Sequence, residues 1–359
     1  MRRVIRLPQR PAASRAPVRT AVPVVARSSV AVAALALLLT AAPSAAAAEP
    51  WAPQSTLFQL NFRWASITLL VSAAGIALGL FGGAFYRRRQ AGLRPGSREV
   101  ERHSVGHRVS HWLNAIGFLL AMGSGAVLTV SWLPNPFALP LLYTLHYVGA
   151  AAILLGLGGT AVHALTTGAS RRHRLLPDGE TLRTAGLELL SYAGLVGDRG
   201  VLGFSGLQWP VSLRREIERA VGFQGFPAEG KYLATQRLLS YPLWVLVSLA
   251  VVATGLLKAL RYAYPLPRTV VFWATRVHDW AFIGTIVMLF IHVAAVVLVR
   301  TNWPLLRSMF TGKVSLAYVQ AVHGRWYQEL LRESAGRAAG AAAPSPSPRP
   351  SPGGGGAPQ

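Results

Sequence analysis

Nine histidines and no cysteine set the metal chemistry open to this 359-residue sequence. Without cysteine there are no disulfides, no Cys-ligated iron–sulfur clusters, no thiolate zinc sites and no covalent attachment of a c-type haem. Any metal must therefore be bound by histidine or by carboxylates. Histidines in long apolar segments are functional candidates by default, because ionisable side chains are costly there, and four of them form a regular pattern. These four are His111, His146, His278 and His292.

His278 and His292 belong to the same apolar segment, fourteen residues apart. In an α-helix, two residues with this spacing point to within about 40° of the same direction and lie about 21 Å apart along the axis. One helix then presents two imidazoles on one side, at two depths. Each of them needs a partner from another helix at its own depth.

Five apolar segments have the length that a helix needs to cross a bilayer. They are about 64–86, 109–131, 141–166, 240–262 and 275–300. Hydrophobic residues make up 52% of the chain, and charged residues make up only 14%, compared with roughly 25% in an average globular protein. The length and unbroken apolarity of the segments exclude a barrel of short alternating strands. The sequence predicts an all-α fold, a polytopic transmembrane helical bundle.

The Lys and Arg residues predict the orientation of this bundle. The connections on one side hold 23 of them and those on the other side hold 5: 87–108, 166–240 and 300–337 against 49–63, 131–142 and 258–276. Because basic connections stay in the cytoplasm, we expect a bacterial inner-membrane protein with a periplasmic mature N-terminus and a cytoplasmic C-terminus. The net charge of +23 is then a topology signal and not a nucleic-acid surface, which the mean hydropathy of +0.37 also disfavours.

This orientation pairs the four histidines by depth. His111 begins an outward-running segment and lies toward the inside with His292, whereas His146 begins an inward-running segment and lies toward the outside with His278. Two neutral imidazoles facing each other across a bundle are an axial ligand set for b-type haem. The pattern predicts an inner and an outer bis-His haem. Small residues expected to let a flat porphyrin approach the backbone are Gly117, Gly123, Gly125, Gly149, Gly156, Gly158, Gly159 and Gly284.

The other five histidines are weaker candidates. His103 and His107 precede the first inner ligand by eight and four residues and imitate a metal-binding stripe, but a solvated basic helix start is the preferred interpretation. His163 lies about 100° away from the face of the first outer ligand and is at most a surface or quinone-pocket residue. His173 belongs to the basic anchor RRHR, and His323 lies in the C-terminal segment.

Three charged residues lie near the expected outer pair. Arg268 and Arg276 suit haem propionates, and snorkelling to the membrane surface is an equally good interpretation. Asp279 is interpreted as a rim acid that faces water, with the orientation of an imidazole as the alternative.

The ends of the chain differ in composition from the bundle. Residues 1–48 combine a basic region, a short apolar run and small residues, which is typical of a signal peptide; an uncleaved anchor is the alternative, because the basic region is long. Residues 49–101 are expected to form a periplasmic N-terminus and an extra transmembrane helix. Residues 334–359 are rich in Pro, Gly and Ser and are predicted to be disordered.

Between these ends, residues 102–333 are predicted to form a di-haem cytochrome b domain. Its connection 167–239 is expected on the cytoplasmic surface, with short helices at 181–190 and 212–221.

Several stretches of this domain resemble the gamma subunit of formate dehydrogenase, the membrane cytochrome b of that complex. The resemblance covers roughly residues 102–333. It is carried by GHRVSHWLNAIGFLLAMGSGAVL (106–128), LHYVGAAAILL (145–155), KYLATQRLLSYPLW (231–244), VHDWAFIGTIVMLFIH (277–292) and GKVSLAYVQAVHGRWYQE (312–329). Other b-type cytochromes would share the histidine pattern, whereas the KY…Q and GKVS…HGRWY elements are more specific to formate dehydrogenase.

The resemblance implies an electron-transfer anchor and not a complete enzyme. Formate would be oxidised on a molybdenum or tungsten alpha subunit, and electrons would pass through an iron–sulfur beta subunit, the outer haem and the inner haem to quinone. This chain has no cysteine and no glycine-rich cofactor fingerprint of its own for formate oxidation.

By the same resemblance, the quinone pocket adjoins the inner haem, with Lys231, Tyr232 and Gln236 as candidate residues. The sequence departs from the family pattern within this stretch. It has Leu233 where the family commonly has Asn, Thr where Gly is common and Arg where Lys is common. The missing amide removes a polar group expected near the quinone.

Three alternatives remain at this point. The nearest is the cytochrome b of another quinone-linked complex, such as a nickel–iron hydrogenase or thiosulfate reductase, which would keep the haems and change the soluble partner. A transporter that uses intramembrane histidines is disfavoured, because the segments lack paired Gly/Pro breaks and contain almost no acids. A non-redox scaffold in which histidines bridge helices would, like the transporter, be colourless.

Overall fold

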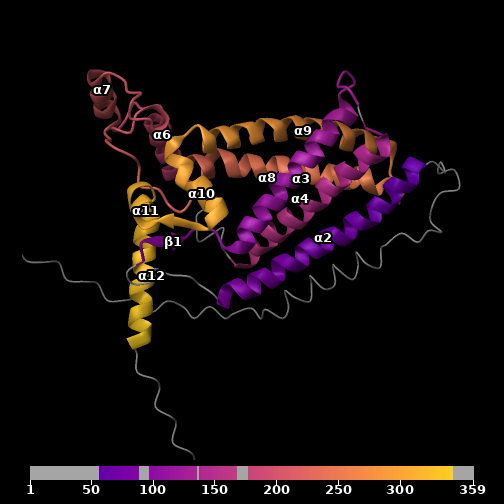
Figure 1. The fold of residues 1–359 in the computed structure, drawn as a ribbon, viewed down its shortest axis with the longest axis horizontal. Helices are drawn as coiled ribbons and strands as arrows, with labels where there is room; N and C mark the ends of the chain where they lie inside the picture. Colours follow the sequence, from indigo (N-terminus) through magenta and orange to yellow (C-terminus); the bar gives the residue numbers. More distant parts are fainter. Residues whose placement is uncertain (1–55, 89–96, 136, 168–176, 343–359) are drawn as a thin grey trace, which may run out of the picture. The chain divides into compact units, whose positions relative to one another are not determined.

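The protein is built around five long helices, seen in a computed structural model that describes residues 56–88, 97–135, 137–167 and 177–342 (Figure 1). The five are α2 (Thr56–Arg88), α3 (Val105–Thr129), α4 (Leu139–Thr167), α8 (Tyr241–Leu260) and α9 (Arg268–Val297). Each is long and apolar enough to cross a membrane. The predicted all-α transmembrane bundle is confirmed.

Four of the five helices begin before the apolar segments read from the sequence, whereas α3, α8 and α9 end two or three residues before those segments do. The first begins at Thr56 and not near residue 64, and α9 begins at Arg268 and not near residue 275. The physical reason is that hydropathy marks only the part of a helix that matches the lipid core, whereas the helix continues into turns with polar residues such as Arg268. Pro267 ends the preceding connection, and α9 starts directly after it.

Small and hydroxyl-bearing residues occupy the buried faces of these helices, and large apolar residues are exposed. Ser124, Thr254 and Thr285 are buried, whereas Phe290 and Leu249 are exposed. Lipid chains are as apolar as leucine, so helices in a membrane associate through close packing of small residues and hydrogen bonds. The helices α2 and α3 both pack along α4, and α8 packs along α9 (Figure 1).

The long connection between α4 and α8 contains the two short helices expected from the sequence. They are α6 (Gly179–Tyr192) and α7 (Val211–Val221). A capping box at Asp178 starts α6: the Asp178 carboxylate accepts a hydrogen bond from the Thr181 N–H, and the Thr181 hydroxyl oxygen accepts one from the Asp178 N–H. The connection then enters α8 through a π-helical turn, η3 (Gln236–Ser240).

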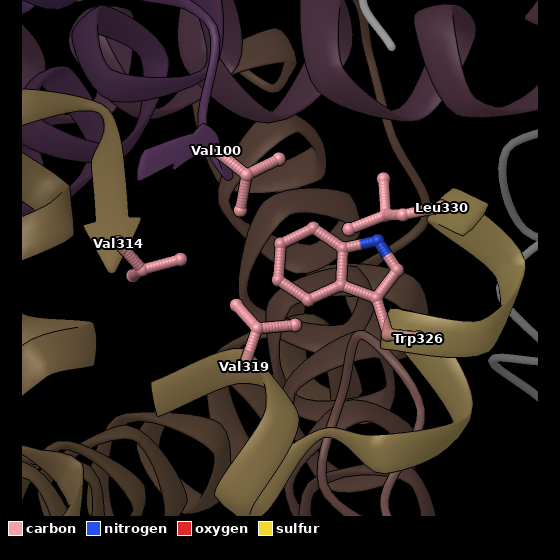
Figure 2. Packing of buried hydrophobic residues seen from close by; sticks show 5 residues of the cluster. All are labelled: Val100, Val314, Val319, Trp326 and Leu330. Carbon is pink, nitrogen blue, oxygen red and sulfur yellow. The ribbon is translucent and has the colours of Figure 1, made fainter. Parts of the chain in front are cut away.

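A small two-stranded sheet, which the sequence did not indicate, joins the segment before α3 to the C-terminal segment. Strand β1 (Glu99–Glu101) pairs antiparallel with β2 (Lys313–Ser315). Helices α10 (Trp303–Thr311), α11 (Leu316–Val322) and α12 (Gly324–Ala342) flank the second strand. The Trp326 ring lies among Val100, Val319 and Leu330, and Val314 completes this buried cluster (Figure 2).

The predictions for the two ends of the chain can be compared with the structure only in part. The expected signal peptide at 1–48 and His173 lie outside the described residues. The boundary of the expected disordered tail at residue 334 is wrong, since α12 continues to Ala342. Five of the nine residues from 334 to 342 are Ala, the strongest helix former, and the prolines begin only at Pro344.

Candidate functional site

The structure brings the four histidines expected to bind haem together as two pairs. The ring centres of His111 on α3 and His292 on α9 are 6.3 Å apart, and those of His146 on α4 and His278 on α9 are also 6.3 Å apart. The ring planes are inclined by 49° in the first pair and by 66° in the second. These are the pairs expected from helix direction and spacing.

The spacing within each pair fits one metal ion shared by two imidazoles. With metal–nitrogen bonds of about 2 Å and ring centres roughly 1.1 Å beyond the bound nitrogens, two imidazoles that share one ion would have centres about 6.2 Å apart, close to the observed separations. In the described part of the chain, no group of three or more His, Cys, Asp or Glu side chains is placed to hold a metal ion. The donor set is therefore two imidazoles per site, which suits haem iron, because the porphyrin supplies the other ligands.

Hydrogen bonds orient both rings of the His146–His278 pair. His146 Nδ1 lies 2.9 Å from the Ala121 carbonyl oxygen and donates to it. His278 Nδ1 lies 3.0 Å from Thr254 Oγ1, which itself donates to the Ala250 carbonyl oxygen and so accepts from the imidazole. Both protons are thus on Nδ1, and Nε2 of each ring keeps its lone pair for a metal. Ligating histidines are usually held in this way.

A mostly apolar cavity adjoins the same pair. All five long helices contribute to its lining, including Thr68 of α2, Phe118 of α3 and Thr285 of α9, together with His146 and His278 themselves. Two glycines lie directly against the imidazoles. A Cβ on Gly125 would be 3.3 Å from His146 Cε1, and one on Gly255 would be 3.2 Å from His278 Cε1.

The His111–His292 pair is enclosed by two tryptophans. Trp112 meets His111 edge-on with ring centres 5.2 Å apart, and Trp244 meets His292 edge-on at 6.4 Å. His111 Nδ1 is buried without a hydrogen-bond partner within the described residues. A buried imidazole nitrogen without a partner is costly, which indicates that this site is built for a bound group.

Most of the glycines expected beside a porphyrin serve helix packing instead. Of the eight glycines expected from the sequence, Gly125 alone lies against a paired histidine. A Cβ on Gly117 would be 2.8 Å from the Gly149 carbonyl oxygen, so this pair lets α3 and α4 approach closely. Gly158 lies against Gly75 of α2. The sequence signal is the same for both uses, because glycine permits close approach of any neighbour.

The three charged residues singled out in the sequence, Arg268, Arg276 and Asp279, show no hydrogen bond or ion pair with His146 or His278 among the described residues, whereas Lys258 of α8 lies near enough to both imidazoles to act on them electrostatically. Arg268 and Arg276 are exposed on α9 and line one groove, and the Arg276 guanidinium lies 5.5 Å from the ring centre of Phe272. Asp279 is half-buried. His163 is also half-buried, and its Nδ1 is 3.7 Å from where a Cβ on Gly82 of α2 would lie, away from both pairs.

A second cluster of polar residues lies beside the small sheet, and the sequence did not reveal it. We call it the interfacial cluster: Arg102, Lys231, His323 and Trp326. Arg102 Nη2 donates to the Lys231 carbonyl oxygen at 2.5 Å, and its Nη1 lies 3.4 Å from His323 Nε2. His323 Nδ1 donates to the Gly230 carbonyl oxygen at 2.6 Å. Burial and the Arg102 charge lower the pKa of His323 to about 3, so this imidazole is neutral.

The residues expected at a quinone pocket lie around this cluster. The Lys231 ammonium is 5.8 Å from the ring centre of Trp326, and Tyr232 meets Tyr241 edge-on at 5.3 Å. The Gln236 side-chain oxygen accepts a hydrogen bond from the Leu233 N–H at 3.2 Å, so it also shapes the local turn. The three residues are close in sequence, and the structure adds the arginine and histidine that hold their loop.

The interpretation of His103 as part of a solvated helix start is wrong. His103 is buried, and its ring stacks on His107 with centres 4.8 Å apart and planes 13° from parallel. Burial, followed by the neighbouring His107, lowers the pKa of His103 to about 2. The tertiary cause is the loop at Gly312, whose carbonyl oxygen accepts from the Arg102 and His103 N–H groups and covers this end of α3.

A model of the prokaryotic cytochrome b561 family matches residues 102–312, more than half of the chain. The matched range includes both histidine pairs and the helices α3, α4, α8 and α9. It begins after α2 and ends before the GKVS…HGRWY segment is complete. The comparison with curated proteins found no match.

Proposed function

The chain belongs to the prokaryotic cytochrome b561 family of membrane haem b proteins, and from this premise we propose that it is the gamma subunit of a respiratory formate dehydrogenase. In this role it passes electrons from an iron–sulfur beta subunit to quinone. Formate itself is oxidised on the molybdenum or tungsten alpha subunit. The two histidine pairs with identical 6.3 Å ring separations are the observation that carries the proposal.

Each pair is proposed to hold one b haem, with His146 and His278 for one and His111 and His292 for the other. A haem bound at either pair supplies reversible one-electron transfer. The residues of the chain bind, orient and shield it. Ala121 and Thr254 fix the rings of His146 and His278, Trp112 and Trp244 enclose the other pair, and the five helices keep these sites out of water.

The proposed direction of electron flow follows from the distribution of Lys and Arg. The His146–His278 pair is placed toward the periplasm, where the iron–sulfur subunit would dock, and the His111–His292 pair toward the cytoplasm. Quinone is proposed to bind near the second pair, at the loop with Lys231, Tyr232 and Gln236. The burial of His103 and Arg102 beside this loop supports a sheltered pocket there.

The interfacial cluster supports formate dehydrogenase over other complexes. The two elements that resemble this enzyme most specifically, at 231–244 and 312–329, are far apart in sequence, yet they meet through Lys231, His323 and Trp326. A nickel–iron hydrogenase cytochrome b remains the second candidate, because it is compatible with the same family. It would keep both haems and receive electrons from a different soluble partner.

The haem part of the proposal is tested by reduced-minus-oxidised spectra and pyridine haemochrome quantification of the purified chain. We expect two b haems per chain, and a colourless protein would contradict the proposal. His292→Ala should lower the ratio to one. His163→Ala, which changes a half-buried histidine outside both pairs, is the matched control and should keep two.

The partner is tested on membranes that contain the native complex. Addition of formate should reduce the b haems, and hydrogen gas should leave them oxidised. Reduction by hydrogen and not by formate would favour the hydrogenase alternative. In the His292→Ala protein, formate should still reduce the remaining haem, while quinone reduction should be lost.

A further inference from the structure

Helix α2 lies outside the residues that match the family, yet it contacts the proposed haem site at His146 and His278. Its Thr68 lines the cavity beside both imidazoles. The Thr68 hydroxyl donates to the Trp64 carbonyl oxygen at 2.5 Å, so it presents a satisfied polar group and a methyl group to the cavity. The chain therefore adds a wall to a site that the family builds from four helices.

A buried hydrogen bond ties α2 to the residue that follows the ligand. The Tyr147 hydroxyl donates to Asn61 Oδ1 at 2.7 Å, and the Asn61 side-chain amide donates to the Leu57 carbonyl oxygen at 2.7 Å. Asn61 is only 3% exposed. Because the second bond fixes the amide, the oxygen of Asn61 is held toward Tyr147.

Ring stacking holds the same tyrosine from the other direction. The rings of Trp64 and Tyr147 are parallel to within 4°, with centres 5.4 Å apart. The Tyr147 ring in turn meets the His146 imidazole edge-on at 6.5 Å. Two residues of α2 thus act on the turn of α4 that carries His146.

The contact between α2 and α4 is close along their length. A Cβ on Gly75 would be 2.7 Å from the Leu154 carbonyl oxygen, and one on Gly79 would be 2.6 Å from Val162 Cβ. Near the N-terminal end of α2, Phe58 meets Tyr262, which follows α8, edge-on at 5.6 Å. Backbones this close leave no room for lipid between the helices.

We propose that α2 is a positioning element for the haem at His146 and His278. Asn61 and Trp64 hold Tyr147, and through it the turn of α4 that bears His146, while α2 closes the site against lipid and water. This inference rests on the proposed function. Water that reaches a haem stabilises the more highly charged ferric form, so loss of the contact should lower the midpoint potential of this haem and not of the other.

The test compares Asn61→Leu, Tyr147→Phe and the double variant with the unchanged full-length protein. Redox titration should resolve two haems, and the His292→Ala protein identifies which component belongs to the pair at His146. We expect that component alone to shift to lower potential in each single variant, with a changed ferric EPR signal. The double variant should shift no further than the singles, because both remove the same bond. Tyr143→Phe, on the same helix and without a hydrogen bond to α2 in the described part of the chain, is the matched control.

The outcomes separate the inference from the function on which it rests. Two haems whose potentials and EPR signals stay unchanged in both variants would overturn the inference and leave the proposed function intact. Equal shifts of both haems, or loss of both, would also overturn it, since they indicate general destabilisation. Fewer than two b haems in the unchanged protein would overturn the proposed function, and the inference with it.

Discussion

At the scale of single residues, the two histidine pairs are held by different means. Both rings of the His146–His278 pair have hydrogen-bond partners for Nδ1, whereas the Nδ1 atom of His111 has none within the described residues. Tryptophans surround the second pair instead. The first pair is thus oriented before a group binds: the Ala121 carbonyl and the Ser124 hydroxyl lie within hydrogen-bond distance of His146 Nδ1, and the Thr254 hydroxyl lies within it of His278 Nδ1.

Replacing that threonine should weaken one site selectively. Thr254→Val keeps the side-chain shape and removes the side-chain acceptor for His278 Nδ1–H, so that the Val251 backbone is the remaining hydrogen-bond partner of the ring. Loss of such a partner typically reduces metal affinity by about 10- to 100-fold. We expect haem at this pair to dissociate first on dilution in detergent, followed by haemochrome quantification, while the other haem stays bound. Thr275→Val, on α9 and bonded only to the Val271 carbonyl oxygen, is the control; equal haem loss from both variants would contradict the role of Thr254.

Buried acids beside the loop that contains Lys231 and Tyr232 make stability depend on pH. Burial, followed by the charge of Glu188, raises the pKa of Glu229 to about 8. The folded chain then keeps a proton that the unfolded chain releases near the ordinary glutamate pKa of 4.5. The free energy of unfolding should therefore fall as pH rises from about 4.5 to about 8, and this effect should be complete above that. The charged groups that face Glu229 are Glu188 of α6, Arg237 of η3 and Arg325 of α12.

Glu229→Gln tests this dependence. Glutamine cannot ionise, so the variant should melt at a higher temperature than the unchanged protein at pH 8.5 and at a similar temperature at pH 5. His323 acts in the opposite sense: its pKa is lowered to about 3, so its contribution is present above pH 6.5 and is lost as pH falls toward 3. Thermal melts in detergent across this pH range measure both. A constant difference between the two proteins at all pH values would refute the titration of Glu229.

At the scale of elements, glycines decide how close the helices lie. Gly117 of α3 meets the backbone of Gly149 on α4, whereas Gly123, also on α3, has open space where a Cβ would lie. Backbone atoms on both sides of the first contact cannot move aside as a flexible side chain can. The distance between the axes of α3 and α4 therefore depends on Gly117 and not on Gly123.

The two glycines provide a matched pair of substitutions. Gly117→Ala should destabilise the bundle by about 1–3 kcal/mol, because the added methyl group forces the two helices apart. Gly123→Ala should be neutral or stabilising by up to about 1 kcal/mol, because alanine favours helix. Thermal melts in detergent and the haem-to-protein ratio measure the two effects. Equal melting temperatures for the two variants would show that the contact between Gly117 and Gly149 does not contribute to stability.

At the scale of the whole molecule, the orientation in the membrane is a prediction from charge. Fusions at the C-terminus and in the connection between α3 and α4 test it. Green fluorescent protein after Gln359 should be fluorescent, and alkaline phosphatase there should be inactive, because a cytoplasmic C-terminus is expected. Alkaline phosphatase inserted near Asn135 should be active. The reverse pattern would exchange the proposed periplasmic and cytoplasmic sides of both sites.

The pairing of the histidines was predictable because it depends on few variables. A membrane helix has a defined length, rise and direction, so spacing along α9 and the direction of α3 and α4 place His111 with His292 and His146 with His278. The same regularity made the five spans recognisable, although not their exact ends. Hydropathy marks only the part of a segment that suits the lipid core, and helices such as α2 and α9 begin before that part.

The interfacial cluster and the role of α2 required the tertiary structure. Arg102 and His323 are 221 residues apart, and Asn61 and Tyr147 are 86 apart, so no local period or motif joins them. The glycines in the sequence were equally ambiguous, because glycine is needed both where two helices approach closely and where a helix approaches a porphyrin. Amino-acid sequence alone determined that this protein crosses the membrane with two pairs of histidines at two depths. Only the packing of distant segments decided which residues hold those histidines in place, because hydrogen bonds and stacking depend on positions that the chain reaches after folding.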